Sequence, residues 1–361
     1  MTEPVPTSLF PPVSDVLQMA KPERVGEPGY YGLPMLKRPL WGWEIAVYFF
    51  GEGVSSGCYV LATAAEFFGG PTYKTFIRVA RFVSLGTMRP CPPLLIADLG
   101  RPERFLHMLR VFKPSSPMNL GAWALTGFGI PVTYMALAQA PQFVPWPFRA
   151  VLTWLPSRAV ALLGLAPAFI MMSYPGVLLS TTSVPMWSHT RVLGAMLASS
   201  SMVTSAAALA LASAIDPFMD ECARDAMRNI EQVAHICEAG AIATYLYQAR
   251  DVAAPLTRGR QAKRFWIGAV GCGLVLPWVL HRAQGRKLNR KMTVVSALLT
   301  LAGGLALKWS IVHAGHESAM DAGATRRVTT ATPENPGWTA SVPRQNRQLG
   351  GVPAAAERLN E

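Results

Sequence analysis

Long apolar stretches alternate with short polar segments along most of the chain. Eight of these stretches have about 20 residues each, enough for a helix to cross the ~30 Å hydrocarbon layer of a bilayer. They show no barrel-like alternation, so their backbone must satisfy its hydrogen bonds within helices. The pattern predicts an all-α polytopic membrane protein. The expected spans are 41–68, 72–97, 118–140, 157–180, 191–214, 229–249, 265–281 and 292–313.

Composition and charge support this class and narrow the partners. Of 361 residues, 51% are apolar and 15% are charged, and the formal net charge is +12. Basic residues lie mostly between the apolar stretches, which suits lipid headgroups better than nucleic acid. The five cysteines are scattered without a C-x-x-C pair, so neither an iron-sulfur ligand set nor a disulfide framework is indicated. We therefore expect membrane lipids as partners, no nucleic acid, and any redox metal in a partner subunit.

The two ends of the chain differ from the spans. Residues 1–40 are polar and rich in proline and lack the apolar core of a signal peptide, so we expect an extramembrane segment. Residues 317–361 are expected to form a second one, extended beyond residue 320. Eight spans place both termini on one face, but the Lys and Arg counts of the loops leave the orientation open.

The first span carries its polar residues on one side. Gly53 and Gly57 lie on the opposite side in a G-x-x-x-G arrangement that would let a neighbouring helix pack closely. Ionisable groups inside a membrane are costly, so this stripe predicts a wet or protonatable path. At about 100° per residue, the following side chains fall within an arc of about 80°: Glu44, Tyr48, Glu52, Ser55, Tyr59 and Glu66.

The sixth span also carries its polar residues on one side. Glu231, His235, Glu238 and Tyr245 occupy one side of the helix, and two carboxyl groups flanking an imidazole can relay a proton. The alternative is static pairing, with Glu231 at headgroup level and Glu238 paired with a base such as Lys308 of the last span. Both interpretations remain open, because a buried charge needs a partner in either case.

The second span contains arginines followed by prolines. Arg78 and Arg81 can extend to the interface, whereas Arg89 is expected to remain inside. The prolines at 90, 92 and 93 remove helical hydrogen bonds, so we expect a break beside Arg89. Arg89 then either binds an anionic or quinone-type oxygen or neutralises a glutamate of the first span.

Residues 101–113 predict a short interfacial helix. Phe105, Met108, Leu109 and Phe112 follow helical spacing, and basic residues occupy the rest of its surface. The segment either anchors the protein at the membrane surface or docks a peripheral subunit. Haem b is not expected, because it needs two facing imidazoles and only His235 lies well inside a span.

Three runs of residues carry a family resemblance. They are 98–118 (DLGRPERFLHMLRVFKPSSPM), 174–187 (YPGVLLSTTSVPMW) and 303–305 (GGL) with Lys308. In these runs the chain resembles the NrfD/PsrC family of membrane subunits of polysulfide reductase, nitrite reductase systems and alternative complex III. The sequence departs from that family at Glu52, where a small residue is common, and at Lys308, where arginine is usual.

The resemblance implies a specific architecture and function. It implies two four-helix bundles, 41–180 and 181–316, in the inner membrane of a bacterium. It also implies a site for exchangeable quinone, menaquinone or ubiquinone, near one face of the first bundle, with no haem or iron-sulfur cluster bound by this chain. The implied partners are a ferredoxin-like iron-sulfur subunit and a molybdenum-containing or multihaem cytochrome subunit.

A quinone site needs hydrogen-bond partners for two oxygens and a protonatable group that leads to water. The candidates are Glu44, Tyr174, Asp98, Arg101 and His107. Tyr174 can donate to a carbonyl oxygen, Glu44 or His107 can accept a proton, and Arg101 can hold Asp98. The structural alternatives are a loop salt bridge between Asp98 and Arg101, core packing of Tyr174 and a solvated Glu44.

Several functions therefore compete. The protein is expected to be a quinone-reactive subunit of a respiratory oxidoreductase, a proton or ion translocating subunit, or an anchor for peripheral redox subunits. A secondary transporter is disfavoured because one broken span is visible and transporters show paired ones. No metal ligands are expected. The candidate proton path consists of Glu52, Glu66, Glu231, His235, Glu238 and Lys308.

Overall fold

A computed structural model describes residues 35–215, 221–284 and 289–330, and within these ranges it is helical without strands. The predicted all-α class is confirmed. The longer helices are α2 (Trp43–Phe68), α3 (Lys74–Met88), α6 (Pro117–Ala138), α9 (Leu165–Ser180), α11 (Val192–Ile215), α12 (Glu221–Gln248), η5 (Arg264–Val275) and α15 (Arg290–Met320). The shorter α-helices are α4 (Cys91–Ala97), α5 (Phe105–Arg110), α7 (Trp146–Trp154), α8 (Ser157–Leu163), α10 (Pro185–Ser188), α13 (Ala254–Thr257), α14 (Leu276–Gln284) and α16 (Ala322–Thr330). Short 3-10 turns are η2 (Pro71–Tyr73), η3 (Pro102–Arg104) and η4 (Pro141–Phe143).

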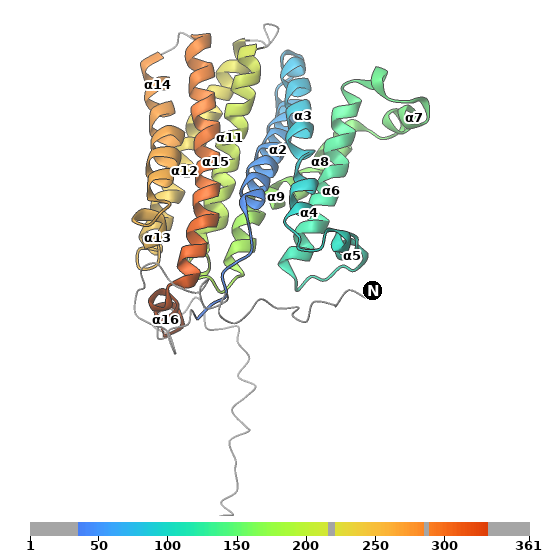
Figure 1. Cartoon of the computed structure of the whole chain (residues 1–361). Coiled ribbons are helices and arrows are strands. Elements are labelled where there is room, and N and C mark those ends of the chain that lie inside the picture. Colours follow the sequence, from blue (N-terminus) through green and yellow to red (C-terminus); the bar gives the residue numbers. More distant parts are fainter. Residues whose placement is uncertain (1–34, 216–220, 285–288, 331–361) are drawn as a thin grey trace, which may run out of the picture.

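The long helices run side by side along one axis, and α5, α13 and α16 gather at one end of it (Figure 1). Among the described residues, six helical segments are long and apolar enough to cross a membrane. They coincide with six of the predicted spans. The other two, 72–97 and 229–249, correspond to α3 with α4 and to α12, which are helical but carry more charge. The six segments are Trp43–Phe68, Pro117–Ala138, Ser157–Ser180, Val192–Ile215, Arg264–Ala283 and Arg290–Met320.

The predicted break in the second span is confirmed. Helix α3 ends at Met88, and α4 begins at Cys91 after Pro90. Proline lacks the backbone N–H that would continue the ladder, so the chain turns here. The 101–113 prediction is confirmed in part, since only Phe105–Arg110 forms an α-helix, preceded by the turn η3.

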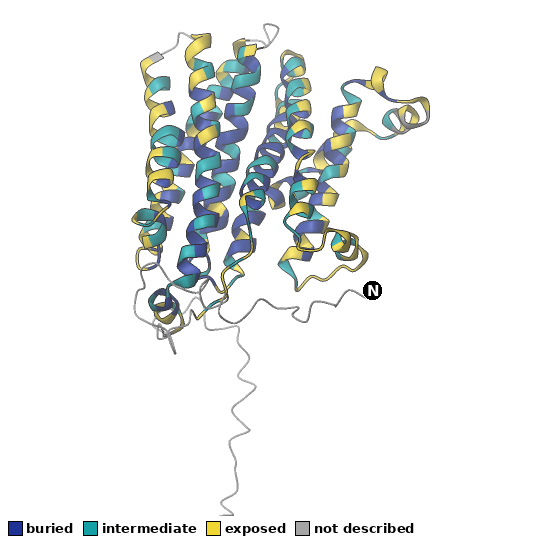
Figure 2. Ribbon diagram, viewed as in Figure 1, coloured by how far each residue is buried: buried dark blue, intermediate teal, exposed yellow. Residues whose placement is uncertain are grey.

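Helix α2 lies at the centre of the molecule and packs against α3, α9, α11 and α15. Its buried positions face these neighbours, while outer helices such as α7 and α14 show many exposed positions (Figure 2). The predicted close approach at Gly53 and Gly57 is confirmed: a Cβ atom on either glycine would collide with Ser201 or Ser205 of α11. The absence of a side chain at these glycines is what lets α2 and α11 pack closely.

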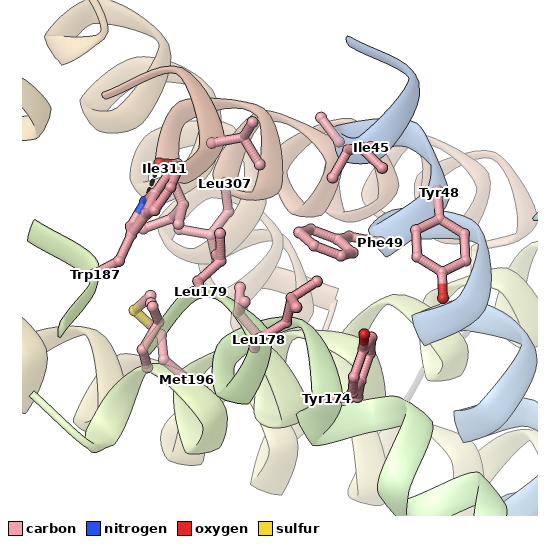
Figure 3. Close-up of a cluster of buried hydrophobic side chains, with 14 of the residues drawn as sticks. Ile45, Tyr48, Phe49, Tyr174, Leu178, Leu179, Trp187, Met196, Leu307 and Ile311 are labelled. Carbon is pink, nitrogen blue, oxygen red and sulfur yellow. Dashed lines mark hydrogen bonds between the residues drawn. The ribbon is translucent and has the colours of Figure 1, made fainter. Parts of the chain in front are cut away.

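Aromatic side chains tie the start of α2 to the last long helix. The rings of Trp41 and Trp187 stack with centroids 5.5 Å apart. The indole N–H of Trp187 donates to the Ile311 carbonyl at 2.9 Å (Figure 3). Gly315 makes room for the Trp187 ring, because a Cβ atom there would overlap it. These contacts hold the entry of α2 against α15.

The end of the described chain differs from the prediction. The last span was expected to end at residue 313, but α15 continues to Met320 and α16 follows. The expectation of an extended segment beyond residue 320 is therefore wrong for 322–330, because Asp321 accepts a hydrogen bond from the Ala324 N–H and starts a new helix. The predicted terminal segments 1–34 and 331–361 lie outside the described residues.

Candidate functional site

A pocket lies between α2, α4, α5, α6 and α9, and its lining is mostly apolar. It encloses about 400 Å³ of space including its open mouth. Among the residues that the structure describes, the pocket lining contains no charged side chain. Two tyrosine hydroxyls supply the polar chemistry of its side chains. Members of the lining include Trp41, Tyr48, Phe49, Met108, Ala122 and Tyr174.

The two pocket tyrosines, Tyr48 of α2 and Tyr174 of α9, point toward one another (Figure 3). Tyr174 was predicted to donate to a ligand carbonyl, but its hydroxyl donates to the Pro117 carbonyl at 2.9 Å. Gly121 accommodates the Tyr174 ring, since a Cβ atom there would overlap it. The proton of Tyr174 is thus engaged in a protein hydrogen bond, and its oxygen remains able to accept one.

Two acids lie beside the mouth of this pocket. The Gly42 N–H donates to the Asp98 carboxylate at 3.1 Å, which fixes the loop after α4 against the start of α2. Burial raises the pKa of the Asp98 carboxyl, and the negative charge of Glu44 raises it further, while the hydrogen bond from Gly42 acts in the opposite direction. Neighbouring residues Trp41 and Leu99 line the pocket. Glu44 and Asp98 therefore form an acid pair next to it.

Arg101 and His107 occupy a different position from the one expected. Both are exposed, and neither lines the pocket. The predicted Asp98–Arg101 salt bridge is absent from the described structure, because Asp98 is held by the backbone of Gly42 instead. Helix α5 reaches the pocket through Met108, which leaves His107 on the outer surface.

The arginines of the second span differ in their surroundings. Arg81 is buried, so the expectation that it extends to the interface is wrong. Arg89 is exposed on the surface of the protein and forms no ion pair with a glutamate of the first span among the described residues. The Arg81 guanidinium pairs with Glu66 at 3.0 Å, donates to Thr63 at 3.0 Å and lies 4.5 Å from the ring centroid of Tyr59. Glu66 is thus held in an ion pair with Arg81.

Lys308 and three other members of the predicted path, Glu52, His235 and Glu238, lie in one buried group. The Lys308 ammonium donates to the Ser200 hydroxyl at 3.1 Å and interacts electrostatically with Glu52 and Glu238. Both Glu52 oxygens are buried without a hydrogen-bond partner of good geometry in the described part of the chain, although the Tyr48 hydroxyl interacts with them. Glu238 also interacts with His235. Glu52 of α2, Ser200 of α11, His235 and Glu238 of α12 and Lys308 of α15 are thus buried polar residues that interact with one another, and we call them the buried polar chain.

His235 continues this buried polar chain toward an unusual helix. Its Nδ1 lies 2.8 Å from the Glu231 carbonyl, and its Nε2 lies 3.2 Å from the Gly273 carbonyl. A neutral imidazole donates from one nitrogen, so a second proton would also find an acceptor in place. Gly273 belongs to η5, a π-helix of 12 residues, a conformation that is rare and often found at functional sites.

A second pocket lies where α11, α12, α14 and α15 meet at the other end of the molecule. Its lining includes the polar side chains of Arg224, Glu231, His281 and Thr293. The His281 Nε2 atom lies 3.8 Å from the Glu231 carboxylate and 3.1 Å from the Ser296 hydroxyl. One Glu231 oxygen is buried without a hydrogen-bond partner among the described residues. Glu231 lies one helical turn before His235 on α12, so this pocket adjoins the buried polar chain.

Some members of these sites were not assigned from the sequence. Tyr48 was placed on the polar stripe of the first span but not at the pocket, because its neighbours on α9 were unknown. Ser200 looked like one of many small residues in an apolar helix. His281 lies at a span end in the sequence, and only packing of α14 against α12 and α15 brings it to Glu231. Helical periodicity identifies which side of a helix carries polar residues, but not which other helix packs against that side.

Known proteins resemble this chain over most of its length. The family "Polysulphide reductase, NrfD" matches residues 33–318. The C chain of the polysulfide reductase of Wolinella succinogenes is 28% identical over 301 residues, 76% of the present sequence and 94% of that protein. Protein NrfD of Escherichia coli K12 is 23% identical over 309 residues, 76% of the present sequence and 95% of that protein. The C subunit of the selenate reductase of Mesobacillus selenatarsenatis is 29% identical over 79 residues, 22% of the present sequence and 18% of that protein.

The family match extends from the segment before α2 to the end of α15, and it includes all six apolar segments. It therefore covers both pockets and the buried polar chain between them. Taken with the length and apolar character of these helices, it shows that the protein is a multi-pass membrane protein of the polysulphide reductase NrfD family.

Proposed function

We propose that this protein is the membrane subunit of a reductase complex and exchanges electrons between a quinone in the α2–α9 pocket and an iron-sulfur subunit. The single observation that carries the proposal is the pocket itself, with an apolar lining and two facing tyrosines. Related proteins are named as parts of polysulfide and selenate reductases. A molybdenum-containing or multihaem cytochrome subunit would complete the complex.

The chemistry of the pocket suits a quinone ring. The aromatic and sulfur-containing side chains of Trp41, Phe49 and Met108 offer apolar contact to a flat ring and its tail. The Tyr174 oxygen can accept a hydrogen bond from a quinol hydroxyl while its own O–H donates to the Pro117 carbonyl. Quinone, menaquinone or ubiquinone, supplies the two-electron chemistry when bound, and this protein supplies position and proton acceptors.

The surface formed by residues 101–113, beside the pocket, offers a docking place for the electron-transfer partner. Basic residues of the 101–113 segment, including Arg101, Arg104 and Arg110, are exposed, while Met108 of the same segment lines the pocket. An iron-sulfur subunit with an acidic surface would be steered to this position by charge and would lie close to the quinone. This favours the docking interpretation of the segment over a simple lipid anchor.

We extend the proposal to the membrane topology. Helices α3 with α4 and α12 lie alongside the six apolar segments (Figure 1), and their charged residues Arg81, Glu231 and Glu238 are buried within the molecule. Charged helices cross a membrane when their charges face the protein interior. Eight spans in two four-helix bundles, 41–180 and 181–316, in a bacterial inner membrane would then follow.

A matched pair of tyrosines tests the quinone site. Tyr174 and Tyr245 are both buried, and each hydroxyl donates to a backbone carbonyl at 2.9 Å, but only Tyr174 lines the pocket. Replacing Tyr174 by Phe should lower quinol turnover by the purified complex by about tenfold, the value of one hydrogen bond of ~1.4 kcal/mol. Tyr245→Phe should leave the turnover close to that of the wild type. Equal turnover in both variants would remove the proposed site.

Proton translocation is a second candidate function, favoured by the buried polar chain. This polar chain begins at the pocket with Tyr48, passes Glu52, Lys308 and Glu238, and continues through His235 toward the second pocket. Helix α2 begins at the end of the molecule that carries α5, whereas α12 begins at the opposite end (Figure 1). Protons released in the first pocket would thus have a route to the other face.

A further inference from the structure

The centre of the buried polar chain contains two acids and one base. Glu52, Glu238 and Lys308 come from three different helices, and their side chains are buried to 0%, 5% and 1% relative exposure. If all three were ionised with a neutral His235, the group would carry one uncompensated negative charge. An uncompensated charge in a low-dielectric interior costs several kcal/mol. One excess proton therefore belongs to this group.

The position of Lys308 does not decide which of the two acids carries the excess proton. Within the described ranges its ammonium forms no direct ion pair with either carboxylate and instead donates to Ser200 at 3.1 Å. Its stem passes close to α2, since a Cβ atom on Gly53 would lie 3.6 Å from Cε of Lys308. Glu238 interacts with the same Ser200 hydroxyl. The neutral Ser200 hydroxyl thus positions the Lys308 ammonium without pairing it with either acid.

We propose that Glu52 and Glu238 share a single proton and that Lys308 relays it between them. This inference rests on the proton route proposed above and names its central device. In one state Glu52 is protonated and Lys308 faces an ionised Glu238; in the other the two acids exchange roles. The other titratable groups that face the three are Tyr48, Cys91, Tyr174 and His235.

Each step of the proton transfer conserves the net charge of the group. Lys308 gives a proton to the Glu238 carboxylate and becomes a neutral amine. Glu52 then gives its proton to that amine, which restores the ammonium and leaves Glu52 ionised. The group has zero net charge before, between and after these steps, so no buried charge is left uncompensated. Lysine suits this role because its amine can release a proton, whereas a guanidinium in a protein does not.

Infrared spectroscopy of the purified complex tests the sharing directly, through the C=O stretch of protonated carboxyl groups. Glu52→Gln and Glu238→Gln should each lose one carboxyl signal, and the double variant should lose the same single signal and no more. Lys308→Met should gain one signal, because both acids must then be neutral. Glu231 contributes the same background to all of these variants.

Other band patterns would overturn the proposal. Loss of one signal in each single variant and of two in the double variant would mean that both acids are neutral beside an uncharged Lys308. Retention of the signal in Glu238→Gln would mean that the proton belongs permanently to Glu52. No loss in any variant would mean that both acids are ionised, with the compensating charge on His235.

Proton translocation in liposomes then tests the relay. Lys308→Arg should keep the carboxyl signals of the wild type but reduce proton translocation per electron to the leak level. Ser200→Ala, which removes the hydroxyl that positions Lys308, should slow translocation, whereas Ser201→Ala on the same helix should not. Wild-type translocation in Lys308→Arg would overturn the relay. If the band pattern holds while the wild type translocates no protons, the sharing stands and the proposed route fails.

Discussion

At the residue scale, the buried charge of Arg81 decides which side of α3 packs against α2. Arg81 and Arg89 look alike in the sequence, eight positions apart in one basic segment. Arg81 is buried against Glu66, Thr63 and Tyr59, and Arg89 faces outward next to the proline break. Periodicity identifies the faces of a helix but not their neighbours, and only the packing of α3 against α2 shows that Arg81 is the buried arginine.

Substituting these two arginines should give opposite results. Arg81→Met leaves Glu66 without its partner in a poorly solvated position and should reduce the free energy of unfolding by about 3–5 kcal/mol. Arg89→Met should change it by less than about 0.5 kcal/mol. Thermal unfolding of the detergent-solubilised protein measures both, and the double variant Arg81→Met/Glu66→Gln should recover part of the loss. Similar losses in the two single variants would contradict the assignment.

The acid pair at the pocket mouth predicts a pH response. Burial and the charge of Glu44 raise the pKa of Asp98 above its ordinary value of 3.8. A raised pKa in the folded state means that this carboxyl stabilises the fold at low pH and that the contribution is lost as pH rises through the raised pKa. Glu44→Gln should therefore lower the pKa of Asp98, as measured by isotope-edited infrared titration. Glu103→Gln, an exposed acid of the same loop, is the control; an unchanged pKa in Glu44→Gln would refute the coupling.

At the element scale, sequence reasoning succeeded where a local rule decides the outcome. Span positions, the break at Pro90 and the close packing at Gly53 and Gly57 all follow from helix chemistry. The pocket and the buried polar chain could be predicted only as helix faces, because Tyr48, Lys308 and Glu238 meet through the packing of four helices. The apolar pattern of residues 264–275 did not distinguish the π-helix η5 from an α-helix. The end of α15 could not be predicted either, because it is set by the turn at Asp321.

The α2–α11 contact can be tested with two glycines. A Cβ atom on Gly57 would lie 2.7 Å from the Cβ of Ser205 and 3.2 Å from the Ser201 carbonyl oxygen, whereas one on Gly86 of α3 would meet nothing within 4 Å. Gly57→Ala should therefore destabilise the protein by about 1–3 kcal/mol through overpacking. Gly86→Ala should be neutral or slightly stabilising, since alanine favours helix. Unfolding temperatures that fall equally in both would contradict close packing at Gly57.

At the scale of the whole molecule, two different pockets lie at opposite ends of one helical bundle. The first is apolar with two tyrosines, and the second contains Glu231 and His281. The buried residues Glu52, Lys308 and Glu238, which interact electrostatically, belong to the buried polar chain. The family match, residues 33–318, covers both pockets.

The central claim is that the α2–α9 pocket binds quinone, and photoaffinity labelling tests it most directly. A photoreactive azidoquinone is bound to the purified complex in a bilayer, irradiated, and located by mass spectrometry. The account predicts labels in the pocket-lining segments 95–122 and 174–178, competition by unlabelled quinol, and weaker labelling in Ala122→Leu, which fills the pocket. Labels confined to 192–320, or labels that quinol does not displace, would contradict it.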